Sequence, residues 1–196
     1  MTSAPSSREA NRARLRDSLI AAARELTIAH GWDQVRMVDV AKAVGVSRQT
    51  VYNEFEGRSG LGEALASAEI EQFVAAVRKE LFAHGADVRA AAYAAILHTL
   101  QEAAGNPLVR AILTSARGGA DELLPYLTTR SDLVLQAAGA VVQEWAEAHL
   151  PDTGPGVIEL ASESIVRLTV SHVVFPLASP ATSATALAEV FVRLLR

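Results

Sequence analysis

Residues 36–61 read RMVDVAKAVGVSRQTVYNEFEGRSGL and predict two short helices joined by a glycine turn. Val40 and Val44 fall on one face of the first helix, and Gly45 can take the left-handed conformation that ends it. Ser47 can then cap the N-terminus of the second helix. Two helices arranged in this way are typical of a helix-turn-helix, in which the second helix enters the major groove of DNA.

The outward side of the second helix carries side chains that can hydrogen-bond to base edges and to phosphates. One further arginine opens the first helix, and another follows the second. The expected DNA-binding residues are therefore Arg36, Ser47, Arg48, Gln49, Thr50, Tyr52, Asn53 and Arg58. A competing interpretation is that the pattern arises by chance, since other pairs of amphipathic helices joined by a glycine also give it.

The same stretch resembles the signature of the TetR family of bacterial repressors. The matching positions are Val40-Ala41, Ala43-Val44-Gly45-Val46-Ser47, Thr50-Val51-Tyr52, Phe55, Arg58 and Leu61. Two positions depart from the family pattern: Gln49 stands where a small residue is usual, and Arg36 stands where threonine is usual. Because both are expected to face DNA, they should change the operator that is read rather than the fold. A glutamine amide can pair with adenine through two hydrogen bonds.

The composition narrows the class of protein. Fifty per cent of the 196 residues are hydrophobic, yet no run of about 18 uncharged apolar residues occurs, so we expect no membrane span. Residues 1–14 lack the apolar core of a secretory signal, and there is no cysteine for a disulfide or a thiolate. We therefore expect a soluble cytoplasmic protein.

Charge is unevenly distributed along the chain, whose formal net charge is −4. Residues 1–60 carry nine Lys or Arg against seven Asp or Glu, whereas residues 61–196 carry nine against fifteen. This division is expected if the N-terminal part meets DNA phosphates. Four arginines precede or open the first helix and form either a phosphate-contacting arm or a solvated basic face: Arg8, Arg12, Arg14 and Arg16.

Apolar residues recur at helical spacing along most of the chain, and no strand-like alternation stands out. Residues 1–9 are rich in serine and proline and are expected to be disordered. Besides the pair in residues 36–61, the expected helices cover residues 11–30, 61–84, 87–104, 107–116, 131–149, 157–174 and 183–196, with a loop at 151–156. We expect one domain of residues 1–60 and a second of residues 61–196.

The last two expected helices have apolar faces wider than one neighbouring helix would cover. These faces either form only the core of one chain or join two copies of it. The resemblance to the TetR family favours the second, a four-helix bundle made by the same two helices of both copies. The expected interface residues are Ile165, Leu168, Thr169, Val173, Leu187, Val190, Phe191 and Leu194.

No arrangement typical of an enzyme is found, since a phosphate-binding glycine loop, a paired-histidine metal motif and a nucleophile elbow are all missing. We expect no catalytic residue, no metal and no cofactor. The resemblance implies instead that the C-terminal domain binds a small effector, which bulky side chains would enclose. The candidates are Tyr93, His98, Tyr126, Trp145, His172 and Phe175, each of which is more common in a core than in a pocket.

The expected fold is therefore all-α. An N-terminal three-helix helix-turn-helix DNA-binding domain precedes a C-terminal helical domain for ligand binding and dimerisation. The expected function is that of a homodimeric repressor, which binds a palindromic double-stranded DNA operator and releases it when a small apolar or amphipathic effector binds. The alternatives are an activator, a regulator that senses no ligand, and, from a different class, a small helical enzyme.

Overall fold

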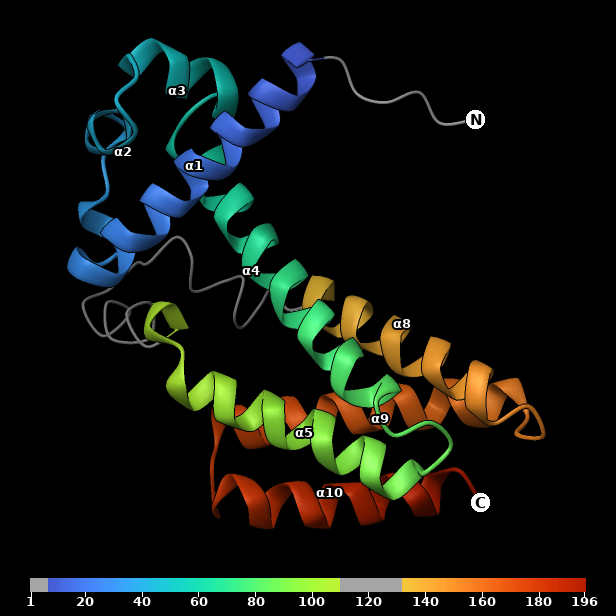
Figure 1. Ribbon diagram of the computed structural model, residues 1–196. Helices are drawn as coiled ribbons and strands as arrows, with labels where there is room; N and C mark the ends of the chain where they lie inside the picture. The colour runs from blue at the N-terminus through green and yellow to red at the C-terminus, as the bar shows by residue number, and fades with distance from the viewer. Residues whose placement is uncertain (1–6, 110–131) are drawn as a thin grey trace. The chain divides into compact units, whose positions relative to one another are not determined.

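The computed structural model describes residues 7–109 and 132–196, and every secondary-structure element in these ranges is helical (Figure 1). The all-α class is therefore confirmed. The elements are α1 (Ser7–His30), the short 3₁₀ helix η1 (Trp32–Gln34), α2 (Met37–Val44), α3 (Arg48–Phe55), α4 (Arg58–Phe82), α5 (Val88–Gly105), α8 (Asp132–His149), α9 (Pro155–Val174) and α10 (Pro180–Leu194). None of these described helices is both long and apolar enough to span a membrane.

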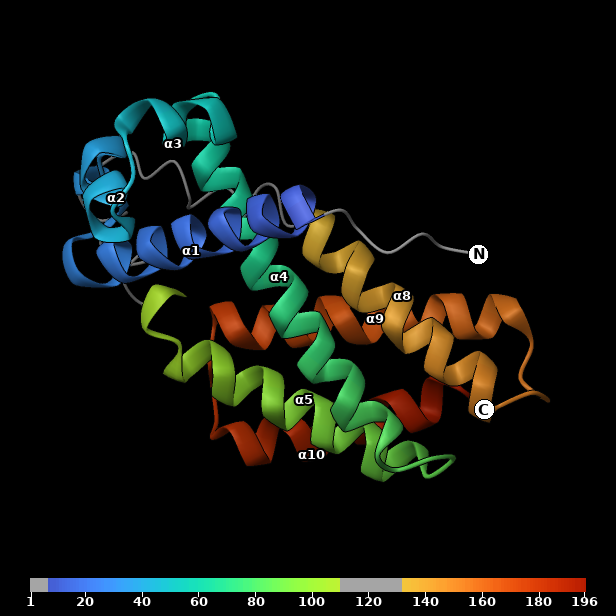
Figure 2. The ribbon, with the colours of Figure 1, turned by 45° about the horizontal axis from the view of Figure 1, so that its top comes forward.

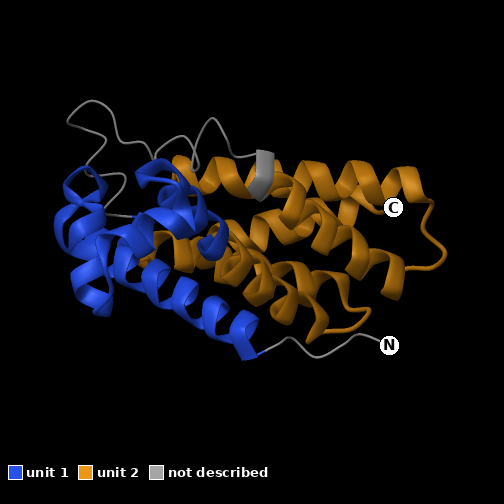
Figure 3. Ribbon diagram, turned by 90° about the horizontal axis from the view of Figure 1, so that it is seen from above, with its two compact units in different colours: residues 1–69, 107–129 blue, residues 70–106, 130–196 orange. Residues whose placement is uncertain are grey.

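The chain divides into two compact units, which Figure 3 shows in different colours. Unit 1 holds the described residues 7–69 and 107–109, and unit 2 holds residues 70–106 and 132–196. The change from one unit to the other falls inside α4, so this helix belongs to both. The domain limits of 1–60 and 61–196 stay a prediction.

Unit 1 is built on the buried faces of α1, α2, α3 and the first turns of α4. Its core includes Leu19, Ala23, Trp32, Val40, Val51, Leu61 and Leu65, which are almost completely buried. The start of α4 lies very close to the end of α3, because a Cβ atom added to Gly60 would lie 2.1 Å from the backbone oxygen of Phe55. Glycine is thus required at residue 60 for the two helices to meet.

Unit 2 is a bundle in which α5 packs along α10, α8 packs along α9, and α9 also contacts α5 and α10 (Figure 2). Three of the five buried residues of α5 and two of the five of α10 are alanines, whose small side chains allow neighbouring helices to approach closely. The core includes Leu81, Ala91, Ala95, Trp145, Ala161, Ala184, Leu187 and Phe191.

Several helix boundaries differ from those expected. Helix α1 begins at Ser7, so residues 7–9 are helical rather than disordered, while residues 1–6 lie outside the described part. The loop expected at 151–156 is shorter, because Pro155 starts α9 at a position where its missing N–H costs nothing. Helix α10 begins at Pro180, where the Ser179 hydroxyl accepts a hydrogen bond from the Thr182 N–H. Most of the helix expected at 107–116 lies outside the described residues.

Candidate nucleic-acid interface

The turn between α2 and α3 forms as the sequence predicts. Gly45 has φ 78° and ψ 31°, the left-handed conformation that ends α2. The N–H of Val46 donates to the oxygen of Ala41 over 3.0 Å, and the N–H of Gly45 donates to the oxygens of Ala41 and Lys42. These bonds satisfy carbonyls at the end of α2 that have no partner inside the helix.

Helix α3 begins with a side-chain cap and is anchored by its apolar residues. The Ser47 hydroxyl accepts a hydrogen bond of 3.1 Å from the N–H of Thr50, as expected of an N-cap. Val51 and Phe55 are buried in the core of unit 1. The opposite side of this eight-residue helix is therefore turned outward.

The outward side of α3 carries two side-chain pairs, each spanning one helical turn. Arg48 donates a hydrogen bond of 3.1 Å to the hydroxyl of Tyr52 and lies over its ring, 5.0 Å from the centroid. Gln49 donates a hydrogen bond of 2.7 Å to the side-chain oxygen of Asn53. A shallow depression of about 380 Å³ lies over Arg48, Gln49 and Tyr52. The two pairs form a row of arginine, amide and hydroxyl groups that matches the donors and acceptors of base edges and phosphates.

The other residues expected to contact DNA differ in how far their side chains are buried. Ser47 and Arg36 are exposed, whereas Thr50 is half-buried beside the cap. Arg58 is held inside unit 1: it donates a hydrogen bond of 2.7 Å to the backbone oxygen of Trp32 and lies over the indole ring. Its guanidinium is also 3.8 Å from the carboxylate of Asp33. A structural role for Arg58 was not foreseen, and its contact with phosphate stays a prediction.

Sequence reasoning also missed Glu54, which lies in the last turn of α3. Its carboxylate accepts hydrogen bonds from Arg12 Nε over 2.9 Å and from Arg16 Nη1 over 3.2 Å. Arg16 additionally donates to the backbone oxygen of Glu54 and lies over the ring of Phe55. Two of the four arginines at the start of α1 are therefore tied to α3, and no local pattern signals this pairing because the partners lie far apart in the chain.

Two family models match the chain. Residues 19–65, which contain α2 and α3, match "Bacterial regulatory proteins, tetR family", and residues 87–193, more than half of the chain, match "Bacterial Tetracyclin repressor, C-terminal domain". The chain belongs to the TetR family. It is thus a DNA-binding regulator of transcription, and the resemblance found in residues 36–61 is confirmed.

Relatives within the TetR family support this assignment over most of the chain. The HTH-type transcriptional regulator AlkX of Mycobacterium tuberculosis is 33% identical over 169 residues, which cover 86% of this chain and 79% of AlkX. The crystal structure of the TetR family repressor AlkX from Dietzia sp. strain DQ12-45-1b has a TM-score of 0.71 and 29% identity, covering 91% of this chain and 94% of that one. A putative TetR-family regulator from Mesorhizobium loti shares the fold, with a TM-score of 0.67 at 18% identity over 93% of this chain and 97% of the other.

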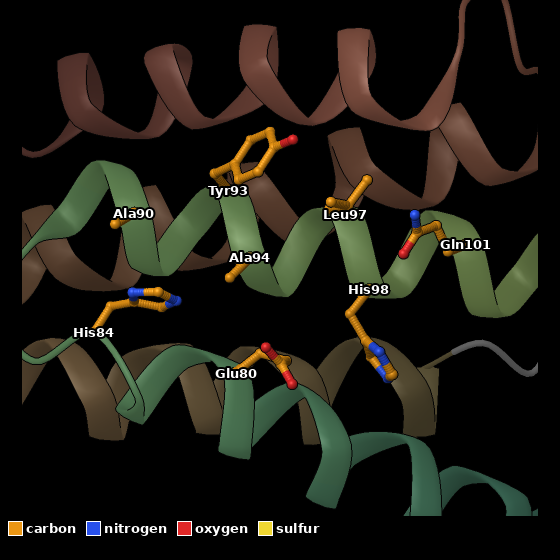
Figure 4. Close-up of a pocket in the computed structure, with 8 residues that line it drawn as sticks. All are labelled: Glu80, His84, Ala90, Tyr93, Ala94, Leu97, His98 and Gln101. Atoms are coloured by element: carbon orange, nitrogen blue, oxygen red, sulfur yellow. The ribbon is translucent and has the colours of Figure 1, made fainter.

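Unit 2 contains a cleft of about 400 Å³ between the last turns of α4 and the helix α5. Its lining residues are Glu80, His84, Ala90, Tyr93, Ala94, Leu97, His98 and Gln101 (Figure 4). Glu80 and His84 reach into the gap from one side and His98 from the other, while Ala90 and Ala94 leave room between the helices. Tyr93 leaves α5 on the side turned away from Glu80.

Of the five expected effector residues in the described part of the chain, two line this cleft, Tyr93 and His98. Trp145 is completely buried in the core, where its indole N–H donates to the oxygen of Gly85 and its ring stacks on His149. His172 and Phe175 lie near the end of α9 and do not line the cleft, and Phe175 is 72% exposed.

The expected lining residue Tyr126 lies outside the described residues. Within the described part, no group of three or more His, Asp or Glu side chains is placed to hold a metal ion. The cleft therefore offers hydrogen-bonding groups from Glu80, His84 and His98 beside small apolar side chains.

The eight residues expected at a dimer interface differ in how far they are buried. Ile165, Thr169, Leu187 and Phe191 are buried within unit 2 of a single chain, so they are not available as direct contacts on its surface. Leu168 and Val190 are exposed, and Val173 and Leu194 are partly buried. Other apolar residues that are exposed on α9 and just beyond it, outside the expected interface residues, are Val157, Leu160, Val174, Phe175 and Leu177.

Proposed function

We propose that this TetR-family regulator is a repressor that binds a palindromic operator as a homodimer and releases it when a small amphipathic effector binds in unit 2. The observation that carries the DNA-binding part is the row of paired side chains on α3, Arg48 with Tyr52 and Gln49 with Asn53. Their intramolecular bonds hold the side chains in place before DNA arrives, which reduces the entropy lost on binding.

Dimer formation is supported by the exposed apolar side chains of α9 and α10. Val157, Leu160 and Leu168 lie on one side of α9, within roughly 80° of one another around the helix axis, and Val190 is exposed on α10. A two-fold axis beside these helices would cover the same patch on both copies. Two heads related by such an axis can reach successive major grooves when their reading helices lie roughly 34–36 Å apart.

The cleft between α4 and α5 is the proposed effector site. Ala90, Ala94 and Leu97 provide an apolar surface, and Glu80, His84 and His98 provide hydrogen-bonding groups. A molecule with a hydrocarbon chain and a polar head fits this division better than a bare hydrocarbon. Since the Dietzia AlkX repressor is implicated in the biodegradation of n-alkanes, we propose an oxidised alkane such as a long-chain alcohol or fatty acid.

The function is tested with DNA taken from upstream of the gene that encodes this chain. Footprinting with the purified protein should protect two half-sites of inverted sequence, and transcription in vitro from that promoter should fall. Addition of long-chain alcohols or fatty acids should restore transcription over the same concentrations that dissociate the complex. Increased transcription would instead indicate an activator, and an unchanged complex with every compound would indicate a regulator that senses no ligand.

A further inference from the structure

The last turn of α3 is attached to α1 through one carboxylate, that of Glu54. Arg12 Nε donates to one carboxylate oxygen over 2.9 Å, and Arg16 Nη1 donates to the other over 3.2 Å. The Glu54 side chain is only 11% exposed, whereas the Arg12 side chain is 70% exposed. A carboxylate removed from water to this extent needs charged partners, and α1 supplies both of them.

Arg16 strengthens the same junction in two further ways. It donates a hydrogen bond of 3.3 Å to the backbone oxygen of Glu54, one of the final carbonyls of α3 that have no partner within the helix. Its guanidinium also lies 4.7 Å from the centroid of the Phe55 ring. The end of α3 is therefore capped by a side chain from another helix.

These contacts bear on recognition because α3 is short. Its eight residues are held by the Ser47 cap at the beginning and by the Glu54 junction at the end, and Arg48, Gln49 and Asn53 lie between the two. A change in the inclination of so short a helix moves these side chains relative to the base edges. Small displacements matter, since hydrogen bonds weaken steeply when their geometry is lost.

The negative charge of Glu54 also supports a role in the geometry of α3. A negative charge next to the DNA-reading residues opposes binding to the phosphates of every sequence. A glutamate at this place therefore weakens general attraction to DNA, so a preference for the operator would have to come from the geometry that Glu54 imposes on α3.

We propose that Glu54 is a positioning residue for DNA recognition. By binding Arg12 and Arg16 it sets how α3 is held against α1, and thereby the preference for the operator over other DNA. This inference rests on the proposed use of α3 as the reading helix.

The test compares Glu54→Gln with the wild-type protein on two duplexes. One is the duplex that the wild-type protein selects from a randomised library, and the other is a scrambled duplex of the same length and composition. Glutamine keeps the shape but has one accepting oxygen, so one of the two arginines is released. We expect tighter binding to the scrambled duplex, weaker binding to the selected one, and a loss of about tenfold in the ratio of the two affinities.

Glu56→Gln is the matched control. Glu56 is exposed, lies two residues further along, and has no side-chain partner among the described residues. Its replacement removes the same charge without touching the junction, so affinity for both duplexes should rise by the same factor. A second variant, Glu54→Asp, keeps the charge but shortens the reach, and it should weaken binding to the selected duplex without strengthening binding to the scrambled one.

Circular dichroism and thermal denaturation would establish that each variant is folded at the temperature of the binding assay. Equal changes on both duplexes for Glu54→Gln and Glu54→Asp would overturn the inference, because Glu54 would then act only through its charge or through general stability. If the wild-type protein selects no sequence and binds both duplexes alike, the proposed function itself fails and the inference falls with it. A wild-type protein that discriminates, with variants that discriminate equally well, would overturn the positioning role alone.

Discussion

Gln49 donates a side-chain hydrogen bond of 2.7 Å to Oδ1 of Asn53, one turn further along α3. This bond uses one of the two N–H groups of the Gln49 amide, so a second N–H and the carbonyl oxygen remain for another partner. A donor and an acceptor side by side complement N7 and the N6 amino group of adenine in the major groove. We propose that Gln49, held by its bond to Asn53, reads an adenine through this remaining donor and acceptor.

The first prediction concerns base readout by this pair. Replacing Gln49 by alanine should cost about 1–3 kcal/mol per half-site and should relax the preference for adenine at one position of the operator. Asn53→Ala should weaken the preference at the same position by a smaller amount. Competition assays against operators substituted at each base pair would measure both effects. A loss of the same size on operator and random DNA would show that neither residue reads a base.

The second prediction separates the structural role of Arg58 from a role at phosphate. Because Arg58 binds the backbone oxygen of Trp32 and covers its ring, Arg58→Ala should destabilise the fold by about 1–2 kcal/mol. Arg36→Ala is the comparison, since Arg36 is exposed and should leave the melting temperature nearly unchanged. The salt dependence of binding to random DNA then tests both arginines. An arginine that binds a phosphate should, when replaced by alanine, reduce the slope of log affinity against log salt by about one, and an unchanged slope would exclude that role.

The third prediction concerns assembly. Leu160 is 62% exposed on α9, so Leu160→Arg should leave the chain folded but convert the proposed dimer to a monomer in sedimentation experiments. Phe191→Arg should instead unfold the protein, because Phe191 is 1% exposed in the core of unit 2. Val38→Arg, at an exposed apolar residue of α2, is the control and should sediment like the wild type. A wild-type protein that is monomeric at micromolar concentration would refute the dimer.

The sequence predicted features that depend on neighbouring residues. The left-handed conformation of Gly45 and the Ser47 cap follow from residues within one turn of each other, and both were located correctly. The pairing of Arg16 with Glu54 joins residues 38 positions apart, and that of Arg58 with Trp32 joins residues 26 apart. No local periodicity encodes which distant side chain an arginine will reach.

The apolar faces of α9 and α10 are a second case in which the sequence predicted only part of the structure. Their periodicity indicates which side of a helix is apolar, but it does not say which part of that side the chain itself covers. Phe191 and Leu187 are covered by α5 and its neighbours, whereas Leu168 and Val190 remain on the surface. Trp145 was expected in a cavity for its size, yet its hydrogen bond to Gly85 holds it inside the core.

The fourth prediction concerns the dependence of stability on pH. Hydrogen bonds from Arg193 and then from Arg89 lower the pKa of the Glu189 carboxyl below its ordinary value of 4.5. Because the folded state has the lower pKa, the stabilisation is complete above the ordinary value and is lost as pH falls through the folded pKa. The melting temperature of Glu189→Gln should therefore fall less than that of the wild type when the pH is lowered below about 4.5. Glu159→Gln, at an exposed residue of α9, is the control and should behave like the wild type. Identical curves of melting temperature against pH for all three proteins would show that the contact of Arg89 and Arg193 with Glu189 adds nothing to stability.

The last prediction tests the cleft as the effector site. Ala94→Trp should fill the space between α4 and α5 and abolish the response to a long-chain alcohol or fatty acid while leaving operator affinity unchanged. Ala75→Trp places the same side chain at an exposed position of α4 outside the cleft, and it should respond like the wild type. Calorimetry with and without operator adds a second requirement, because the factor by which effector weakens DNA binding must equal the factor by which DNA weakens effector binding. An Ala94→Trp protein that still binds the effector and releases the operator would place the effector site elsewhere. Saturable binding of effector to the wild-type protein with no effect on operator affinity would mean that the cleft binds a ligand without acting as a switch.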